Sequence, residues 1–362
     1  MKVDRVPFRR LVAGPPPAPD RILFTNLWFR GHNNPRYAEL LPRLDRLDRF
    51  LVVLPESRIP RGVAFRALWA ARGLRNRLVL GAAARRYRFL FTADNEQIPH
   101  FPGKIVSDVD DPRYTPREVA QLNAPNVEAY VVTAERAARR FEGLGVLKPW
   151  YVIPQGVSLS SLSPERVREV ARRSRRDGEV VVGHMAAWLL AEGDRGGENP
   201  LYNVDHLLEL WDEIHGRVPS ARLWLIGGAS DRVRERLGGR DDVLLFGRLP
   251  REEALAHAAN FDVALYARTE DQGIQAAKVA EYMGLGVPTV SYDYRVTEVL
   301  RETGAGLLVP GGREFVDAVV GLAEDGARRA ELAAAANRAG AALDWDTLAE
   351  RYEREILDVH LR

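Results

Sequence analysis

Two charged side chains stand three residues apart in the stretch KVAEYMG, which begins at Lys278 and includes Glu281. Lysine is rare in this chain, because only Lys2, Lys104, Lys148 and Lys278 occur among its 52 basic residues. On a helix, an exposed ion pair at this spacing contributes only about 0.2–0.5 kcal/mol. The alternative is that both side chains bind one ligand. The sequence around them is needed to choose between an ion pair and a binding site.

The longer stretch DQGIQAAKVAEYMG has the features of a nucleotide site at the start of a helix. Unpaired N–H groups and the helix dipole at such a terminus favour a diphosphate. Gly273 permits close approach of the backbone, and Ile274 and Gln275 supply amides. Lys278 adds a positive charge about one turn into the helix, and Glu281 presents a carboxylate to the ribose hydroxyls.

Other nucleotide-binding motifs are missing from the sequence. A dinucleotide fold requires G-x-G-x-x-G after a strand, and a P-loop requires G-x-x-x-x-G-K-[ST]. The chain instead has FRGHNNP after its first predicted strand and GGAS after LWLI. A hydride-transfer enzyme and a P-loop NTPase are therefore disfavoured.

A second polar cluster, KIVSDVDDPRYT, contains Asp108 and Asp110 in a D-x-D pattern. Carboxylates in this pattern are suited to holding Mg²⁺ under a diphosphate. The alternative is that Asp110 and Asp111 cap the turn before Pro112, and this proline also excludes the D-x-D-x-[TV] pattern of a phosphatase. Because the predicted helix-terminus site binds phosphate without a metal, we expect no metal ligands and no cofactor.

Composition describes an ordinary globular protein. The chain has 362 residues, 46% hydrophobic and 28% charged residues, a net charge of +2 and no cysteine. Disulfides and thiolate metal sites are therefore excluded, and no aromatic-studded basic tract points to nucleic acid. The N-terminal stretch lacks the apolar core of a signal peptide, and no apolar run approaches the roughly 18 residues that a membrane span needs. We expect a cytoplasmic protein of bacterial origin.

Two predicted helices carry local start signals. Thr115 is the expected N-cap of one, with Pro116 at its first helical position, and Asn203 is the expected N-cap of the other. The helix that follows Asn203 has an apolar face made by Val204, Leu207, Leu208, Trp211 and Ile214.

Predicted strands alternate with helices along nearly the whole chain, which indicates parallel sheets with right-handed crossovers. The length and a Gly/Ser/Pro-rich stretch predict two α/β domains. The expected organisation is an arm at 1–19, a first domain at 20–153, a linker at 154–165, a second domain at 166–344 and a last helix at 345–362 that returns to the first domain. The fold is therefore predicted as two doubly wound Rossmann-like domains that face each other across a cleft, where ligands bind at the carboxyl ends of the strands.

From about residue 150 to 310 the sequence resembles the retaining group 1 glycosyltransferases (family 4) of the GT-B fold. VIPQGVSLSSLSPE is similar to their linker signature, and KVAEYMGLGVPTVS is the most specific segment. LWLIGG, LLFGRLP, FDVALYA and GAGLLVP follow the order and spacing of the family. The resemblance covers most of the second domain and, more loosely, the first.

The resemblance implies roles for several residues of the second domain. Glu281 binds the donor ribose, the diphosphate lies at the helix start from Gly273 with Lys278 beside it, and the base lies against Gly247 and Arg248. His184 follows the first strand of the second domain, and we expect it to face the phosphates. Gly273 itself stands where the family often has a glutamate that contacts the transferred sugar.

On the acceptor side, the family has a glycine-rich turn after its first strand. Gly31 fits that turn, and His32 and Asn33 are candidates for acceptor contact, with loop capping as the alternative. Asp110 occupies the strand end that faces the reacting sugar in the family. A carboxylate there stabilises positive charge on the sugar, and Asp110 and Asp108 are the expected catalytic residues.

The sequence therefore predicts a hexosyltransferase-type glycosyltransferase that moves a sugar from a nucleoside-diphosphate sugar to a small-molecule or glycan acceptor. The resemblance implies retention without a required metal, and peripheral membrane contact stays open. One alternative is a nucleotide-sugar epimerase or hydrolase on the same fold. The other is a non-catalytic glycosyltransferase-like partner protein.

Overall fold

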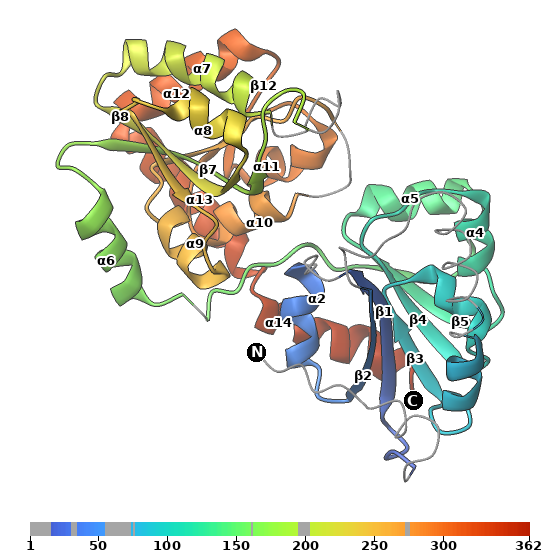
Figure 1. Cartoon of the computed structure of the whole chain (residues 1–362). Helices are drawn as coiled ribbons and strands as arrows, with labels where there is room; N and C mark the ends of the chain where they lie inside the picture. Colours follow the sequence, from blue (N-terminus) through green and yellow to red (C-terminus); the bar gives the residue numbers. More distant parts are fainter. Residues whose placement is uncertain are drawn as a thin grey trace. The chain divides into compact units, whose positions relative to one another are not determined.

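The computed structural model describes residues 16–29, 35–54, 74, 77–160, 162–194, 203–271 and 276–362. The chain divides into two compact units (Figure 1). Unit 1 comprises Met1–Pro154 and Trp345–Arg362, and unit 2 comprises Gln155–Asp344. The C-terminal segment thus belongs to the same unit as the N-terminal half of the chain.

Unit 1 is built on a six-stranded sheet with the order β2-β1-β3-β4-β5-β6, and every recorded strand pair is parallel. The strands are β1 (Ile22–Phe29), β2 (Leu47–Leu54), β3 (Phe89–Thr92), β4 (Lys104–Val109), β5 (Val127–Val132) and β6 (Trp150–Val152). The helical segments are α2 (Pro35–Leu40), η1 (Leu41–Arg43), η3 (Asn95–His100), α4 (Pro116–Leu122), α5 (Glu135–Gly143), α14 (Trp345–Arg351), the π-helical η5 (Tyr352–Leu357) and α15 (Asp358–His360). The chain direction across the sheet reverses between β1 and β3.

The C-terminal segment completes the core of unit 1. Side chains of β1, β3 and α2 form one apolar cluster with buried residues of α14 and η5. The buried members contributed by the C-terminal segment are Trp345, Leu348, Ala349, Tyr352, Ile356, Leu357 and Leu361. In Figure 1, α14 lies beside α2, in agreement with the contacts between these two helices. Burial of this apolar face is the main force that attaches the segment to unit 1.

Unit 2 contains a second six-stranded sheet with the order β12-β11-β10-β7-β8-β9. Its strands are β7 (Val180–Leu189), β8 (Ala221–Ala229), β9 (Val243–Gly247), β10 (Val263–Tyr266), β11 (Thr289–Tyr292) and β12 (Gly306–Val309). Its helical segments are α6 (Pro164–Ser174), α7 (Val204–Arg217), α8 (Asp231–Leu237), α9 (Arg251–Ala258), α10 (Ala277–Gly284), η4 (Arg295–Thr297), α11 (Glu298–Thr303), α12 (Gly312–Glu324) and α13 (Gly326–Ala341). The switch point lies between β7 and β10, which are neighbours although the chain visits β8 and β9 between them.

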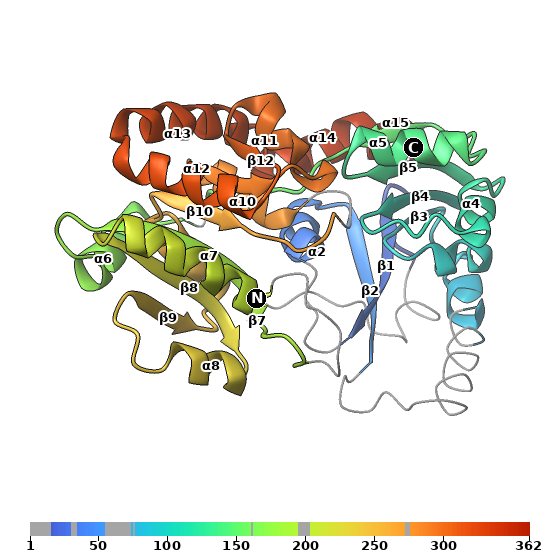
Figure 2. The ribbon, with the colours of Figure 1, turned by 90° about the horizontal axis from the view of Figure 1, so that it is seen from above.

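Helices cover both faces of the second sheet (Figure 2). Because successive strand residues point to opposite faces, Leu223 and Leu225 of β8 pack in the cluster with α7 and α12. Trp224 and Ile226 pack in the other cluster, with α6 and α9. This double coverage explains why the strands are apolar runs without polar alternation.

Local sequence signals for two helices are confirmed. The Thr115 hydroxyl accepts from the amide of Glu118 and caps α4, with Pro116 at the first helical position. Asn203 caps α7 by accepting from the amide of Asp205 at 2.9 Å. The apolar face predicted for α7 is buried in the core of unit 2; its members are Val204, Leu207, Leu208, Trp211 and Ile214.

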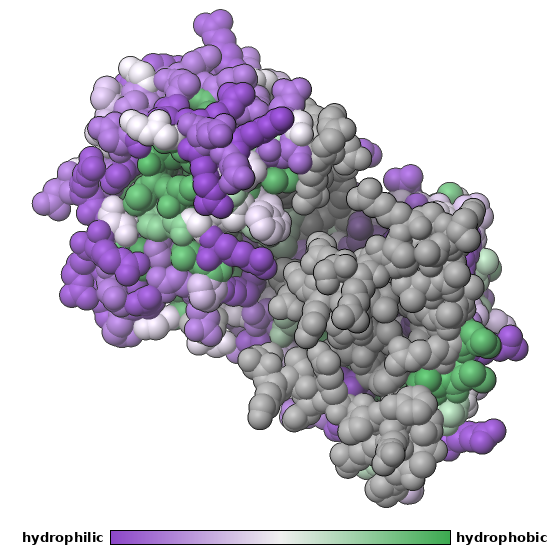
Figure 3. Space-filling view, viewed as in Figure 1, coloured by the Kyte–Doolittle hydropathy of each residue, from purple (hydrophilic) through white to green (hydrophobic). Residues whose placement is uncertain are grey.

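The face of unit 2 seen in Figure 3 is mostly hydrophilic, with hydrophobic residues gathered near its middle. Within the described ranges, no helix is both long and apolar enough to span a bilayer. The described surface still exposes several large apolar side chains, among them Leu147 and Trp188.

Candidate donor-nucleotide site

Helix α10, which carries Lys278 and Glu281, is fixed against its neighbours on two sides. The Tyr282 hydroxyl accepts from the amide of Met185 in β7 at 2.9 Å, inside the core. On another side, α10 touches α13 so closely that a Cβ at Gly340 would lie 2.5 Å from the Cα of Gly284. These contacts fix the helix at the carboxyl end of the β7–β10 pair, where doubly wound sheets bind ligands.

Glu281 is a buried carboxylate with a defined cationic partner. Only 4% of the residue is exposed, and Nη1 of Arg251 donates to its Oε1 at 2.7 Å. A buried carboxylate is costly unless it is paired and hydrogen-bonded, so this position is built to hold a charge. Lys278, on the same helix, is half-buried.

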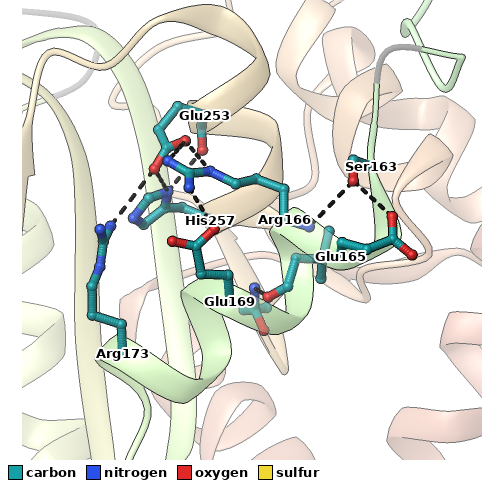
Figure 4. A network of polar contacts seen from close by, with 9 residues as sticks. Ser163, Glu165, Arg166, Glu169, Arg173, Glu253 and His257 are labelled. Atoms are coloured by element: carbon teal, nitrogen blue, oxygen red, sulfur yellow. Dashed lines mark hydrogen bonds and ion pairs between the residues drawn. The ribbon is translucent and has the colours of Figure 1, made fainter.

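Arg251 is the first residue of α9, and α9 is tied to α6 by a charged network (Figure 4). Glu253 accepts from Arg166 at 2.6 Å and lies 3.7 Å from Arg173. The imidazole of His257 lies in the same network and bonds through Nδ1 to the carbonyl of Glu253 at 2.7 Å. Helix α9 thus presents Arg251 to Glu281 from an anchored element.

His184 lies at the switch point between β7 and β10. It is 2% exposed, and its Nδ1 lies 3.0 Å from the carbonyl oxygen of Leu265. A carbonyl only accepts, so Nδ1 carries the proton in this contact. Burial lowers the pKa of His184 to about 4, and the positive charge of Lys278 acts in the same direction. His184 is therefore neutral at pH 7 and is electrostatically coupled to Lys278.

Gly247 and Arg248 begin the turn that leads from β9 into α9. Gly247 has φ +72°, a left-handed conformation that favours glycine. Arg248 is exposed, and its guanidinium carbon lies 5.8 Å from the centroid of the Trp188 ring. Arg251, which donates to Glu281, stands three residues after Arg248. The β9–α9 turn therefore carries both arginines.

Six of the predicted site residues lie outside the described part of the chain. On the donor side these are Gly273, Ile274 and Gln275, and on the acceptor side Gly31, His32 and Asn33. Helix α10 itself starts at Ala277, with Ala276 as its N-cap. The predicted roles of these six residues remain predictions.

Asp108, predicted as a catalytic residue, is enclosed in the core of unit 1. Arg36 of α2 contacts both of its carboxylate oxygens, at 3.0 and 3.4 Å, and the Tyr352 hydroxyl donates to Oδ2 at 2.6 Å. Arg36 also donates to the carbonyl oxygens of Ile153 and Pro154. Burial raises the pKa of Asp108, and the guanidinium of Arg36 opposes that shift. These contacts give Asp108 a packing role that joins α2, β4, the end of β6 and η5.

Asp110, two residues later, is half-buried just beyond the carboxyl end of β4. Asp108 is enclosed whereas Asp110 is only partly buried, and the negative charge of Asp110 adds to the raised pKa of Asp108. Asn95, another polar side chain of this strand edge, is held by Ser107 and Glu118 in a structural network. Within the described residues, no group of three or more His, Cys, Asp or Glu side chains is arranged to hold a metal ion.

Sequence patterns did not point to Arg251 or Trp188. Arg251 lies 30 residues from Glu281, and a pattern read along one helix carries no signal for a partner on another. Trp188 sits within an apolar run that is typical of a buried strand. Its exposure follows from a register shift between Met185 and Trp188 in the pairing of β7 with β8, which the sequence pattern does not predict.

Comparison with known proteins agrees with this architecture. The family model described as glycosyl transferases group 1 matches residues 196–325. HepE of Anabaena, solved with UDP-glucose, shares 17% identity and a TM-score of 0.66 over 93% of this chain and 99% of that one. A glycosyltransferase of Rickettsia africae has 11% identity and a TM-score of 0.68 over 94% of this chain and 98% of its own.

A third similar structure is the α,α-trehalose 6-phosphate synthase of Burkholderia multivorans, with 13% identity and a TM-score of 0.63 over 94% and 98% of the two chains. The search of curated proteins found no match. The predicted GT-B fold is confirmed, and the resemblance to group 1 glycosyltransferases is confirmed over the matched residues.

Proposed function

We propose that this GT-B chain, whose residues 196–325 match the group 1 model, transfers a sugar from a nucleoside-diphosphate sugar to an acceptor. The observation that carries the proposal is the buried Glu281 carboxylate beside Lys278 and the neutral His184, at the switch point of the second sheet. The UDP-glucose complex of the similarly folded HepE supports this choice of donor class. The resemblance further suggests a hexosyl donor.

Glu281 and Lys278 bind different parts of the donor in the proposed complex. The Glu281 carboxylate accepts hydrogen bonds from the two ribose hydroxyls, with Arg251 holding it in place from the other side. Lys278 and the amides before α10 neutralise the diphosphate. Their positive charge counts most when the diphosphate leaves, because negative charge then develops on its terminal oxygen.

We propose retention of configuration at the anomeric carbon, as the resemblance implies. The bond from that carbon to the phosphate oxygen breaks, a bond to the acceptor oxygen forms on the same face, and the acceptor proton passes to the leaving phosphate. The Asp110 carboxylate, beyond the end of β4, stabilises positive charge on the sugar. The second unit supplies the positive charges that bind the diphosphate, so the reaction needs no metal ion. The acceptor is a small molecule or a glycan.

Substitution of Glu281 tests the proposal directly. Hydrogen bonds to a charged group are worth about 1.5–3 kcal/mol, so Glu281→Ala should weaken nucleoside-diphosphate binding roughly ten- to a hundredfold in calorimetric titration. Glu302→Ala, which removes an exposed glutamate of α11, is the matched control and should leave the affinity unchanged. A Glu281→Ala affinity within twofold of wild type would refute the donor site.

Product analysis separates the enzymatic alternatives. A glycosyltransferase releases nucleoside diphosphate in proportion to glycosylated acceptor. A hydrolase releases free sugar without an acceptor, and an epimerase returns an isomer of the donor. A non-catalytic protein on this fold produces none of these.

A further inference from the structure

The pairing of β7 with β8 is irregular at the carboxyl edge of the second sheet. Met185 is opposite Ile226 and Trp188 is opposite Gly228, so Ala186 and Ala187 together face Gly227. A bulge of this kind re-aims the side chains that follow it. As a result Ala187 and Trp188 are exposed, whereas Leu189 is buried again.

The glycines of β8 make room for this arrangement. Gly227 has φ +154°, and a Cβ there would lie 2.3 Å from the carbonyl oxygen of Ala186. A Cβ at Gly228 would lie 2.9 Å from the ring of Trp188. The indole therefore rests on the bare backbone of Gly228, which supports the ring, while 49% of Trp188 remains exposed.

Arg248 stands over the same indole. Its guanidinium carbon is 5.8 Å from the ring centroid, within the range of a cation–π interaction. Among the described residues Arg248 forms no hydrogen bond or ion pair, so its five N–H donors stay available to a ligand. The exposed indole of Trp188 and the guanidinium of Arg248 thus lie together. Arg248 stands three residues before Arg251, which donates to Glu281.

The resemblance already implies that the base lies against Gly247 and Arg248; we infer that Trp188 is the stacking platform of that base subsite. The base takes the place over the indole that Arg248 occupies here, and the guanidinium turns to donate to a base carbonyl. The inference rests on the proposed function, because it extends the same site from the ribose to the base. Aromatic faces stack on any base. Arginine donors match the carbonyl oxygens of uracil, thymine or guanine, whereas adenine has no carbonyl.

Four probes and two substitutions test the inference. Calorimetric titration with UDP, GDP, dTDP and ADP first identifies the nucleotide that binds wild-type protein most tightly. Trp188→Ala should then weaken that nucleotide about ten- to a hundredfold, and Trp188→Phe should restore most of the affinity. Binding of inorganic pyrophosphate, measured by competition, should be the same in wild type and Trp188→Ala because pyrophosphate has no base.

Trp150 provides a matched control for Trp188. It also has an arginine over its ring, with the Arg139 guanidinium carbon 5.1 Å from the centroid, but it belongs to the first unit. Trp150→Ala should leave the nucleotide affinity unchanged. Nucleotide should also quench the indole emission of wild type more strongly than that of Trp188→Phe, a signal that a purely structural role of Trp188 does not produce.

Arg248→Ala should reduce the preference for the carbonyl-bearing nucleotide over ADP about tenfold, whereas Arg234→Ala, at an exposed arginine of α8, should not. Tight nucleotide binding with an unchanged affinity in Trp188→Ala would overturn the base subsite and leave the proposed function intact. An equal loss of nucleotide and pyrophosphate binding would overturn it as well. Failure of all four nucleotides to bind wild type would refute the proposed function together with this inference.

Discussion

At the scale of single residues, Glu281 is an acid whose charge is balanced before any ligand arrives. Its side chain is almost fully buried, and Arg251 donates to it from the first turn of α9. The contact with Arg251 holds the carboxylate in one orientation, so binding a nucleotide requires little rearrangement of the site. The same arrangement makes Arg251 a residue on which local stability depends.

Arg251→Ala is expected to lower the free energy of unfolding by about 1–3 kcal/mol, because it leaves a buried carboxylate without its charged partner. Arg251→Lys keeps the charge and should recover part of the loss. Urea denaturation measures both. Equal stability of wild type and Arg251→Ala would show that Glu281 is solvated well enough to need no partner.

The buried His184 should make the free energy of unfolding depend on pH. Its folded pKa of about 4 is below the ordinary value of 6.5. Between these values the unfolded chain binds a proton that the folded chain does not, so stability falls as the pH drops from 6.5 to 4, by roughly 3 kcal/mol from this residue. In His184→Gln the decline over this window should be shallower by that amount, as measured by urea denaturation at several pH values. Parallel pH profiles would contradict the assignment.

At the scale of elements, the C-terminal segment of unit 1 is held by a buried polar network of Arg36, Asp108 and Tyr352. The Tyr352 hydroxyl lies 2.6 Å from both Arg36 and Asp108 and connects η5 with α2 and β4. Removing one partner from a buried charged network leaves the others undercompensated. Arg36 can be fully buried because Asp108 and Tyr352 pair with its guanidinium.

Tyr352→Phe removes only that hydroxyl and should cost about 1–3 kcal/mol in urea denaturation. The nucleotide affinity should not change, because the residues of the proposed donor site belong to the other unit. Tyr282→Phe is the comparison in unit 2, since its hydroxyl anchors α10 to β7. If Tyr352→Phe were as stable as wild type, the polar network would contribute nothing to holding η5 on unit 1.

The sequence predicts those features that depend on neighbouring residues. The caps Thr115 and Asn203 and the apolar face of α7 are local, and all three are confirmed. Asp108 shows the limit, because its partners lie 72 and 244 residues away. An acidic residue at a strand end has the same appearance in a sequence whether it faces a ligand or an arginine in the core.

At the scale of the whole molecule, the chain leaves and re-enters the first unit, at Pro154 and Trp345. The segment after Pro154, predicted as a linker, is packed in unit 2. Val157 is fully buried there, and its amide donates to the carbonyl of Leu343 at 2.9 Å. Both passages between the units therefore start next to each other in unit 2, a pairing that the sequence could not reveal.

We propose that the second unit binds a nucleoside diphosphate through α10 and the β9–α9 turn without a metal. Hydrogen–deuterium exchange of the intact protein in EDTA, with and without saturating nucleotide, tests it most directly. We expect slower exchange in α10 and in residues 247–251 when nucleotide is bound, and unchanged exchange in residues 104–111. Protection confined to residues 104–111, or protection that appears only when Mg²⁺ replaces EDTA, would contradict it.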